Sequence, residues 1–462
     1  MSINSKGHEA LDRDVPHGFG IHLSKFSNRG DNAGNSVMLR GSRRNPPGSA
    51  GEGSSFMYAS RLWPRLLLAA TLGLACVEQT GNPASDAGTP DAGETDGPDA
   101  GHGDAGSQDA GLPDSGTPDA GFPDAGPPHA RARIFFSGHS LLDNPMPDYV
   151  DSIARSLGKD ILWNQQNSIG SPLRVRTWGN TGWEGYRQGK NREGYGMNVV
   201  QELLSPRTLG PGDQYDTLLI TERHDILGTI EWENTIGYLR HYHDRLIAGN
   251  PEGITYFYHT WLDIDKANPA RWINYEKNAL AAWECVSSKV NLTLQDAGRG
   301  DRVVTLPGGA ALVDLVERVL ANQVPGISGT TEQKLNMIFS DNVHLTALGA
   351  YYLAAVHHAS VFRDSPAGAA GPPEANAETV RALQTIAWNF VSAYYAQPGA
   401  GTRTMADCRT RISQDVCPGF WTILGQPRNT AGCQNYFSNA NPGPGGNPFV
   451  WPDPNWQPLP SP

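Results

Sequence analysis

The 462-residue sequence lacks any apolar run long enough to cross a membrane. Its only strongly apolar run, residues 66–75, is about ten residues long, whereas a spanning helix needs about 20. This segment is therefore too short for a transmembrane helix. Because Arg61 and Arg65 precede it, the segment has the pattern of the n- and h-regions of a secretory signal.

The sequence also lacks a basic stripe. It contains 47 acidic and 36 basic residues, a formal net charge of −11. Residues 77–130 contain eleven acidic side chains and no Lys or Arg, so this segment alone accounts for the excess. Residues 131–462 carry about −4, an ordinary surface charge. Since no cluster of cations is available to neutralise phosphates, we expect no nucleic-acid partner.

Cysteine is scarce, and the first of the five cysteines directly follows the apolar run. Cys76 comes after Gly-Leu-Ala, which resembles a bacterial lipoprotein signal, where the cysteine is diacylated and becomes the mature N-terminus. The sequence departs from that pattern at Gly73, where Leu is usual. The resemblance implies lipidation at Cys76 and an exported, membrane-anchored protein in the periplasm or at the cell surface. A soluble export signal that is cleaved nearby is the alternative.

These features divide the first part of the chain. The signal would begin at Met57, so we interpret residues 1–56 as a mis-assigned N-terminal extension and residues 57–76 as the signal peptide. Residues 77–130 repeat Asp-Ala-Gly and Pro-Asp-Ala-Gly and contain almost nothing to bury. Such a segment cannot offset the entropy of ordering, so we expect a disordered acidic linker that serves as a tether.

The other four cysteines are an even number in a chain that we expect to be exported. They are Cys285, Cys408, Cys417 and Cys433. The sequence therefore predicts two disulfides. Three pairings are possible, and we expect Cys408–Cys417 with Cys285–Cys433.

From residue 131 onward, strand-like segments alternate with helical ones. We expect strands at 133–136, 160–164, 215–221, 253–259 and 301–306, and helices at about 146–157, 231–248, 268–288, 309–322 and 346–361. This alternation predicts a parallel sheet covered on both faces, a three-layer α/β/α domain over 131–365. Beyond a Pro-, Ala- and Gly-rich break, residues 376–462 predict a helix at 378–395 and a small irregular C-terminal extension that contains disulfides.

Two short motifs supply the residue types of nucleophilic catalysis. Ser140 lies between the first strand and the helix that follows it, at the sheet edge where α/β proteins bind ligands. Asp341 and His344 offer a carboxylate and an imidazole at i, i+3, the pair that a serine nucleophile needs. The same spacing occurs at Asp14–His17 and Asp99–His102, so the position of the pair just before the last helix carries the inference.

The segments Phe136-Ser-Gly-His-Ser-Leu141 and Asp341-Asn-Val-His-Leu-Thr-Ala-Leu-Gly349 resemble the SGNH (GDSL-like) hydrolase family over about 230 residues. Those enzymes carry Gly-Asp-Ser-Leu after the first strand and Asp-x-x-His before the final helix. The resemblance implies a flavodoxin-like fold and ester hydrolysis without a cofactor. It also implies that Ser140 is the nucleophile, that His344 is the general base and then acid, and that Asp341 orients His344.

The same resemblance implies an oxyanion hole formed by Ser140, Gly170 and His224. Gly170 best fits the glycine of the family's second block, with Gly179 and Gly182 as competitors and a plain turn glycine as the alternative. The third block is normally Gly-x-Asn-Asp, whereas this chain has Glu222-Arg-His-Asp225, which puts His224 in the place of Asn. A neutral His224 would donate instead; the alternative is a salt-bridged loop. His139 likewise stands where Asp is usual.

Other notable side chains have plainer interpretations. His241 and His243 are two positions apart on a predicted helix and point to nearly opposite faces, and the adjacent His357 and His358 have the same difficulty, so we expect no metal. The aromatic residues of the extension either pack it on its neighbour, stack on sugar rings or form a lid; they are Phe420, Trp421, Trp451 and Trp456.

The sequence thus predicts a monomeric serine esterase that removes short acyl groups, above all acetyl, from small esters or an external carbohydrate. A lipase, thioesterase or acyltransferase with the same triad is the first alternative. The second is a non-catalytic surface-binding lipoprotein on a decayed hydrolase fold. The departure at the third block favours that second alternative, and the order Ser, Asp, His opposes it.

Overall fold

The computed structural model describes residues 128–178, 189–190, 196–441 and 445–460. The expected signal, Cys76 and nearly all of the linker lie outside these residues, as do Gly179 and Gly182. Within the described ranges, no helix combines the length and the apolar character needed to span a bilayer.

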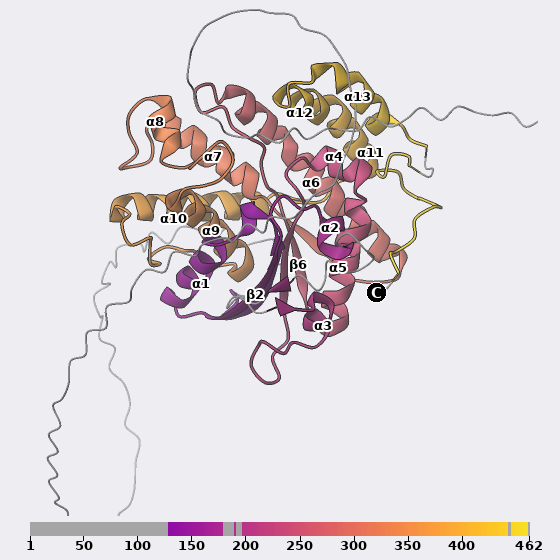
Figure 1. The fold of residues 1–462 in the computed structure, drawn as a ribbon, viewed down its shortest axis with the longest axis horizontal. Helices are drawn as coiled ribbons and strands as arrows, with labels where there is room; N and C mark the ends of the chain where they lie inside the picture. Colours follow the sequence, from indigo (N-terminus) through magenta and orange to yellow (C-terminus); the bar gives the residue numbers. More distant parts are fainter. Residues whose placement is uncertain (1–127, 179–188, 191–195, 442–444, 461–462) are drawn as a thin grey trace, which may run out of the picture. The chain divides into compact units, whose positions relative to one another are not determined.

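Five parallel strands form the centre of the molecule (Figure 1). They are β1 (Arg131–Gly138), β2 (Asp160–Asn167), β5 (Thr217–Thr221), β6 (Ile254–Tyr258) and β7 (Val303–Leu306). Their order in the sheet, β2-β1-β5-β6-β7, is the flavodoxin-like order. Two short antiparallel strands, β3 (Gly189–Lys190) and β4 (Gly196–Met197), continue the sheet beyond β2. The expected parallel α/β sheet is confirmed.

Helices cover both faces of this sheet, as the burial of β1 requires. Ile134 and Phe136 pack with α1 (Met146–Ser156), α7 (Gly308–Leu320), α9 (Ala347–Phe362) and α10 (Ala377–Tyr395). Phe135, which points the other way, packs with α3 (Val199–Leu204), α5 (Thr235–Gly249) and α6 (Ala270–Asp296). Shorter helices are η1 (Ser140–Leu142), α2 (Leu173–Trp178), α4 (Ile226–Trp232) and α8 (Thr331–Asn336).

The C-terminal extension is helical over much of its length, so the expectation of an irregular segment is wrong. It contains α11 (Met405–Arg411), the π-helical turn η3 (Ile412–Val416), α12 (Cys417–Ile423), η4 (Pro427–Asn429) and α13 (Thr430–Ser438). The Thr404 side chain caps α11 by accepting from the Asp407 amide. Residues 405, 408, 412, 416 and 420 are buried at helical spacing, a pattern that predicts a helix.

The two expected disulfides are present, but with another pairing. Cys285 pairs with Cys408, and Cys417 with Cys433. The expected Cys408–Cys417 pair is wrong because the two residues lie nine positions apart on one continuous helical stretch. At about 1.5 Å per residue they are separated by roughly 13 Å, about twice the Cα spacing that a disulfide allows. Cys285, in the middle of α6, takes Cys408 instead.

Candidate active site

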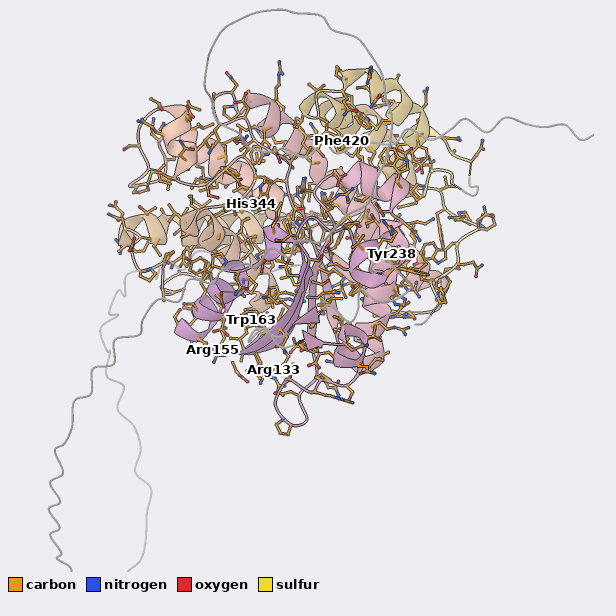
Figure 2. The ribbon with its side chains drawn as sticks, in the orientation of Figure 1. Arg133, Arg155, Trp163, Tyr238, His344 and Phe420 are labelled. Atoms are coloured by element: carbon orange, nitrogen blue, oxygen red, sulfur yellow. A yellow bond between two sulfur atoms is a disulfide. The ribbon has the colours of Figure 1, made fainter. Side chains whose placement is uncertain are left out.

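Ser140, His344 and Asp341 form a continuous hydrogen-bonded chain. The Ser140 hydroxyl oxygen lies 3.0 Å from Nε2 of His344. Nδ1 of the same ring lies 2.7 Å from Oδ2 of Asp341. Ser140 follows the carboxyl end of β1, and Asp341 and His344 lie in the loop that precedes α9. Figure 2 labels His344. An imidazole that lies between a hydroxyl and a carboxylate can accept the hydroxyl proton while the carboxylate orients the ring.

The loop that holds Asp341 and His344 is folded around the aspartate itself. Oδ1 of Asp341 accepts hydrogen bonds from the backbone amides of Val343, at 2.7 Å, and His344, at 2.6 Å. The Ser340 amide donates to the His344 carbonyl at 2.8 Å and closes the turn. One carboxylate therefore shapes the backbone with one oxygen and orients the imidazole with the other.

These contacts keep Asp341 ionised. Burial by itself favours the neutral acid, but the hydrogen bonds from His344 and Val343 outweigh it and lower the pKa of Asp341 to about 2. The carboxylate is thus available as an acceptor for the imidazole at any pH above about 3.

His139 secures the turn that carries Ser140. Its Nδ1 accepts from the Leu141 amide, at 3.4 Å, and caps η1. Because Nδ1 is an acceptor, Nε2 bears the proton and donates to the Glu222 carbonyl, at 3.1 Å. Burial lowers the pKa of His139 to about 3, so the ring is neutral. His139 therefore joins the ends of β1 and β5.

The segment Glu222–Asp225 contains one of the ion pairs expected for a salt-bridged loop, but Glu222 does not take part in it. Arg223 and Asp225 form an ion pair, at 2.5 Å. The Glu222 side chain is buried instead, where it accepts from the Leu173 amide, the Arg223 amide and the Thr235 hydroxyl. This carboxyl group connects the end of β5 to the first turn of α2, a role that the motif did not indicate.

His224 lies between β5 and α4, and one of its ring nitrogens makes no hydrogen bond to the described residues. Its Nδ1 is buried and has no hydrogen-bond partner among the residues that the structure describes. Its ring centroid lies 6.0 Å from that of His139. Burial, which outweighs the attraction of nearby carboxylates, lowers the pKa of His224. A neutral imidazole carries one N–H donor, but Nδ1 of His224 is buried and the residue does not line the pocket beside Ser140.

Gly170 occupies a turn after β2. The Ser171 amide donates to the Ser168 carbonyl at 3.1 Å, and Gly170 sits between them with φ of +64°. This conformation favours glycine, so the turn alone accounts for the residue type. A role for its amide in an oxyanion hole stays a prediction.

A small pocket of about 130 Å³ opens beside Ser140 and His344. Its other lining residues are mostly apolar: Leu141, Asp143, Asn144, Pro145, Met146, Trp261, Leu345 and Ala350. Sequence analysis did not single out Trp261. Its position just beyond β6, at the same sheet edge as Ser140, was the available signal.

The remaining singled-out side chains lie elsewhere and mostly serve packing. Phe420 and Trp421 are buried, and the Lys289 ammonium lies 4.6 Å from the Trp451 ring centre. Trp456 lines a separate hollow of about 270 Å³. The four histidines at 241, 243, 357 and 358 are all buried within α5 and α9.

Comparisons with known proteins gave a weak structural likeness. No family model matches the chain, and no curated protein matches it. A solved structure to which it is similar is that of a DUF4886 family protein from Bacteroides uniformis, with 14% identity and a TM-score of 0.40. That match covers 58% of this chain and 98% of the other.

Proposed function

We propose that this protein is a serine esterase of the SGNH hydrolase type. The observation that carries the proposal is the chain of contacts from the Ser140 hydroxyl through His344 to Asp341, at 3.0 and 2.7 Å. The three groups come from two distant motifs and meet at the carboxyl edge of a parallel sheet, where such folds bind ligands. The resemblance of both motifs to the family supports the same conclusion.

The reaction would proceed through an acyl-enzyme. Oγ of Ser140 attacks the ester carbonyl carbon while His344 Nε2 takes the hydroxyl proton, and the carbonyl electron pair moves onto oxygen. The Ser140 amide, with Gly170 and His224 as the other candidates, would stabilise this oxyanion. When the tetrahedral intermediate collapses, the bond to the alcohol breaks and His344 returns the proton to the alcohol. Water, deprotonated by His344, then releases the acid and restores Ser140.

The pocket beside Ser140 favours short acyl groups. A volume of about 130 Å³ is slightly smaller than an engineered cavity of about 150 Å³ that holds benzene. An acetyl or butyryl group fits within this space, whereas an eight-carbon chain would extend beyond it. We therefore propose acetyl and other short acyl esters as substrates, with an acylated external carbohydrate as the physiological class. A lipase or long-chain thioesterase would need a longer groove.

The carbohydrate proposal rests on the expected location of the protein. Lipidation at Cys76 and the acidic linker would hold the domain outside the cytoplasm, near external polymers. Intact-mass analysis of protein from the membrane fraction tests this directly. An acylated N-terminal Cys76 is expected, and an unmodified N-terminus at another residue would contradict it.

A fluorophosphonate probe separates the esterase from the non-catalytic alternative. Wild-type protein should be labelled at Ser140, while Ser140→Ala protein of the same thermal stability should not. A panel of p-nitrophenyl esters from acetyl to octanoyl, tested in parallel, measures hydrolysis. Absence of both labelling and hydrolysis in folded wild-type protein would favour a binding protein on a decayed hydrolase fold.

A further inference from the structure

A buried acid–imidazole pair lies beneath the candidate active site. His259, the first residue after β6, and Glu276, in α6, are both almost completely buried. Nε2 of His259 faces Oε2 of Glu276 at 3.6 Å. Neither atom has a hydrogen-bond partner within the described residues. Burying polar atoms without hydrogen-bond partners costs folding free energy, so their presence here calls for an explanation.

The second oxygen of Glu276 reaches the segment that follows β6. Oε1 accepts from the Leu262 amide, at 2.7 Å. Two residues near Leu262 in this segment form hydrogen bonds with the loop of Asp341 and His344. The Trp261 indole donates to the Val343 carbonyl at 2.9 Å, and the Ile264 amide donates to the Asn342 carbonyl at 2.8 Å.

These contacts lead from Glu276 to the centre of the Asp-x-x-His motif. Asn342 and Val343 are the two residues between Asp341 and His344, and both of their carbonyls are held by the segment that Glu276 anchors. We propose that Glu276, supported by His259, is a positioning residue that fixes the distance between His344 and Ser140. This inference rests on the proposed esterase function and deepens it.

The other side of His259 is equally constrained. Its Nδ1 accepts from the Ala310 amide at 3.3 Å, and its carbonyl accepts from the Gly309 amide at 2.8 Å. A Cβ at Gly309 would lie only 2.7 Å from the His259 ring, so glycine is needed for this approach. The first turn of α7 therefore fixes the imidazole against which Glu276 rests.

Two substitutions separate positioning from stability. Burial raises the pKa of Glu276 well above its usual range and so favours the neutral acid, which an amide resembles closely. Glu276→Gln keeps an acceptor for the Leu262 amide, while Glu276→Leu fills the space without one. We expect the Gln variant to keep most of its kcat and the Leu variant to lose about 10- to 100-fold in kcat with little change in KM, as for small misplacements of reacting groups.

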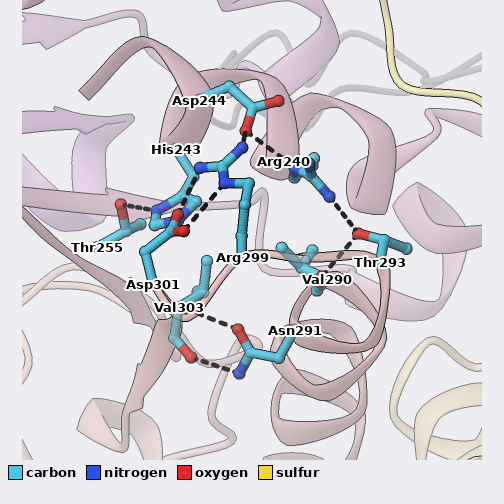
Figure 3. Close-up of polar contacts among 10 residues, drawn as sticks. All are labelled: Arg240, His243, Asp244, Thr255, Val290, Asn291, Thr293, Arg299, Asp301 and Val303. Atoms are coloured by element: carbon cyan, nitrogen blue, oxygen red, sulfur yellow. Dashed lines mark hydrogen bonds and ion pairs between the residues drawn. The ribbon is translucent and has the colours of Figure 1, made fainter. Parts of the chain in front are cut away.

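The chain offers a matched control in a second acid–imidazole pair, shown in Figure 3. His243 contacts Asp301 at 2.7 Å and the Thr255 hydroxyl at 2.8 Å, and His243 is fully buried. This pair lies at the amino ends of β6 and β7, whereas Ser140 is at their carboxyl edge. Asp301→Asn should lower the thermal midpoint and leave kcat unchanged.

The outcomes are separable by measuring kcat, KM, the rate of fluorophosphonate labelling and the thermal midpoint for each variant. A folded Glu276→Leu protein with wild-type kcat and labelling rate would overturn the inference and leave the esterase proposal standing. A Gln variant as impaired as the Leu variant would also overturn it, because the retained acceptor would then be irrelevant. Folded wild-type protein without hydrolysis or labelling would overturn the proposed function itself, and this inference with it.

Discussion

The Ser140 hydroxyl oxygen lies 3.0 Å from Nε2 of His344, although the two residues are 204 positions apart in the chain. The fold brings them together because one follows the first strand and the other precedes the helix α9 that packs beside it. Local secondary structure alone could not bring these two residues into contact. The contact is therefore sensitive to whatever fixes the end of β1 and the loop before α9.

The first prediction concerns this contact. Ser140→Ala and His344→Ala should each lower kcat for acetyl esters by several orders of magnitude, and the double variant should be scarcely worse than either, because the residues act as a unit. Asp341→Asn should fold normally and lose up to about 10⁴-fold in kcat, because the imidazole loses its orienting acceptor. Steady-state kinetics measure this, and an active Ser140→Ala protein would contradict the whole mechanism.

The second prediction concerns His224, which stands where the proposed SGNH pattern would place an Asn. If His224 donates to the oxyanion, His224→Ala should lower kcat by about 10²- to 10³-fold with little change in KM, as for other oxyanion donors. His224→Asn restores the donor of the family pattern and should recover part of the rate. The ion pair of Arg223 with Asp225 provides the control, since Asp225→Asn should alter stability more than kcat. Equal activity of the Ala variant and wild type would assign His224 a packing role.

The sequence was sufficient to predict the parallel sheet and to single out Ser140, Asp341 and His344, which the structure brings into contact. Each of the five parallel strands is separated from the next by at least one helix, and Ser140 follows the first strand while Asp341 and His344 precede α9. What the sequence could not supply was the long-range support. No sequence motif surrounds Glu276. Its proposed positioning role depends on the hydrogen bond from the Leu262 amide, in the segment that contacts the loop of Asp341 and His344.

The extension illustrates a different limit. Gly, Pro and aromatic residues suggested irregular structure, yet the spacing of Met405, Cys408, Ile412 and Val416 is helical. The expected Cys408–Cys417 pairing is wrong because consecutive helical turns separate these two cysteines. Connectivity of four cysteines needs knowledge of the elements that carry them.

The third prediction follows from the observed pairing. Cys285–Cys408 spans 123 positions and Cys417–Cys433 spans 16. Under the chain-entropy model, removing the first pair with Cys→Ala substitutions should lower the free energy of unfolding by about 4–5 kcal/mol and removing the second by about 3 kcal/mol. Urea titration of the two double variants gives the order, and reduced wild-type protein should be less stable than either. A larger loss from the short loop would contradict the model.

The fourth prediction concerns the acyl pocket. Ala350 lines it from α9 and Met146 from α1, and both side chains are almost fully buried. Ala350→Leu should fill much of the space and lower kcat/KM even for acetyl esters, because overpacking excludes the acyl group. Met146→Ala should enlarge the pocket and shift the preference toward butyryl and hexanoyl esters. Ala350→Ser is the size-matched control, and an unchanged chain-length profile in all three variants would place the acyl group elsewhere.

The last prediction uses a buried histidine to test how acid acts on stability. His357 is fully buried in α9, where its Nδ1 donates to the Leu353 carbonyl at 2.7 Å, and burial lowers its pKa to about 4. In the unfolded chain the same group titrates near 6.5. Between pH 6.5 and 4 the unfolded chain therefore binds a proton that the native protein does not, so this histidine destabilises the fold as the pH falls.

Replacing the imidazole should remove that contribution. His357→Gln, which retains a donor for the Leu353 carbonyl, lacks the group that takes up the proton on unfolding. The stability of the variant relative to wild type should therefore rise by about 2 kcal/mol between pH 7 and pH 5, whatever the difference at pH 7. Carboxyl groups with raised pKa values, such as Glu222 and Glu276, affect both proteins equally and cancel in this difference. Urea unfolding at the two pH values measures it, and a difference that does not change with pH would mean that His357 takes up its proton equally readily in the native protein and in the unfolded chain.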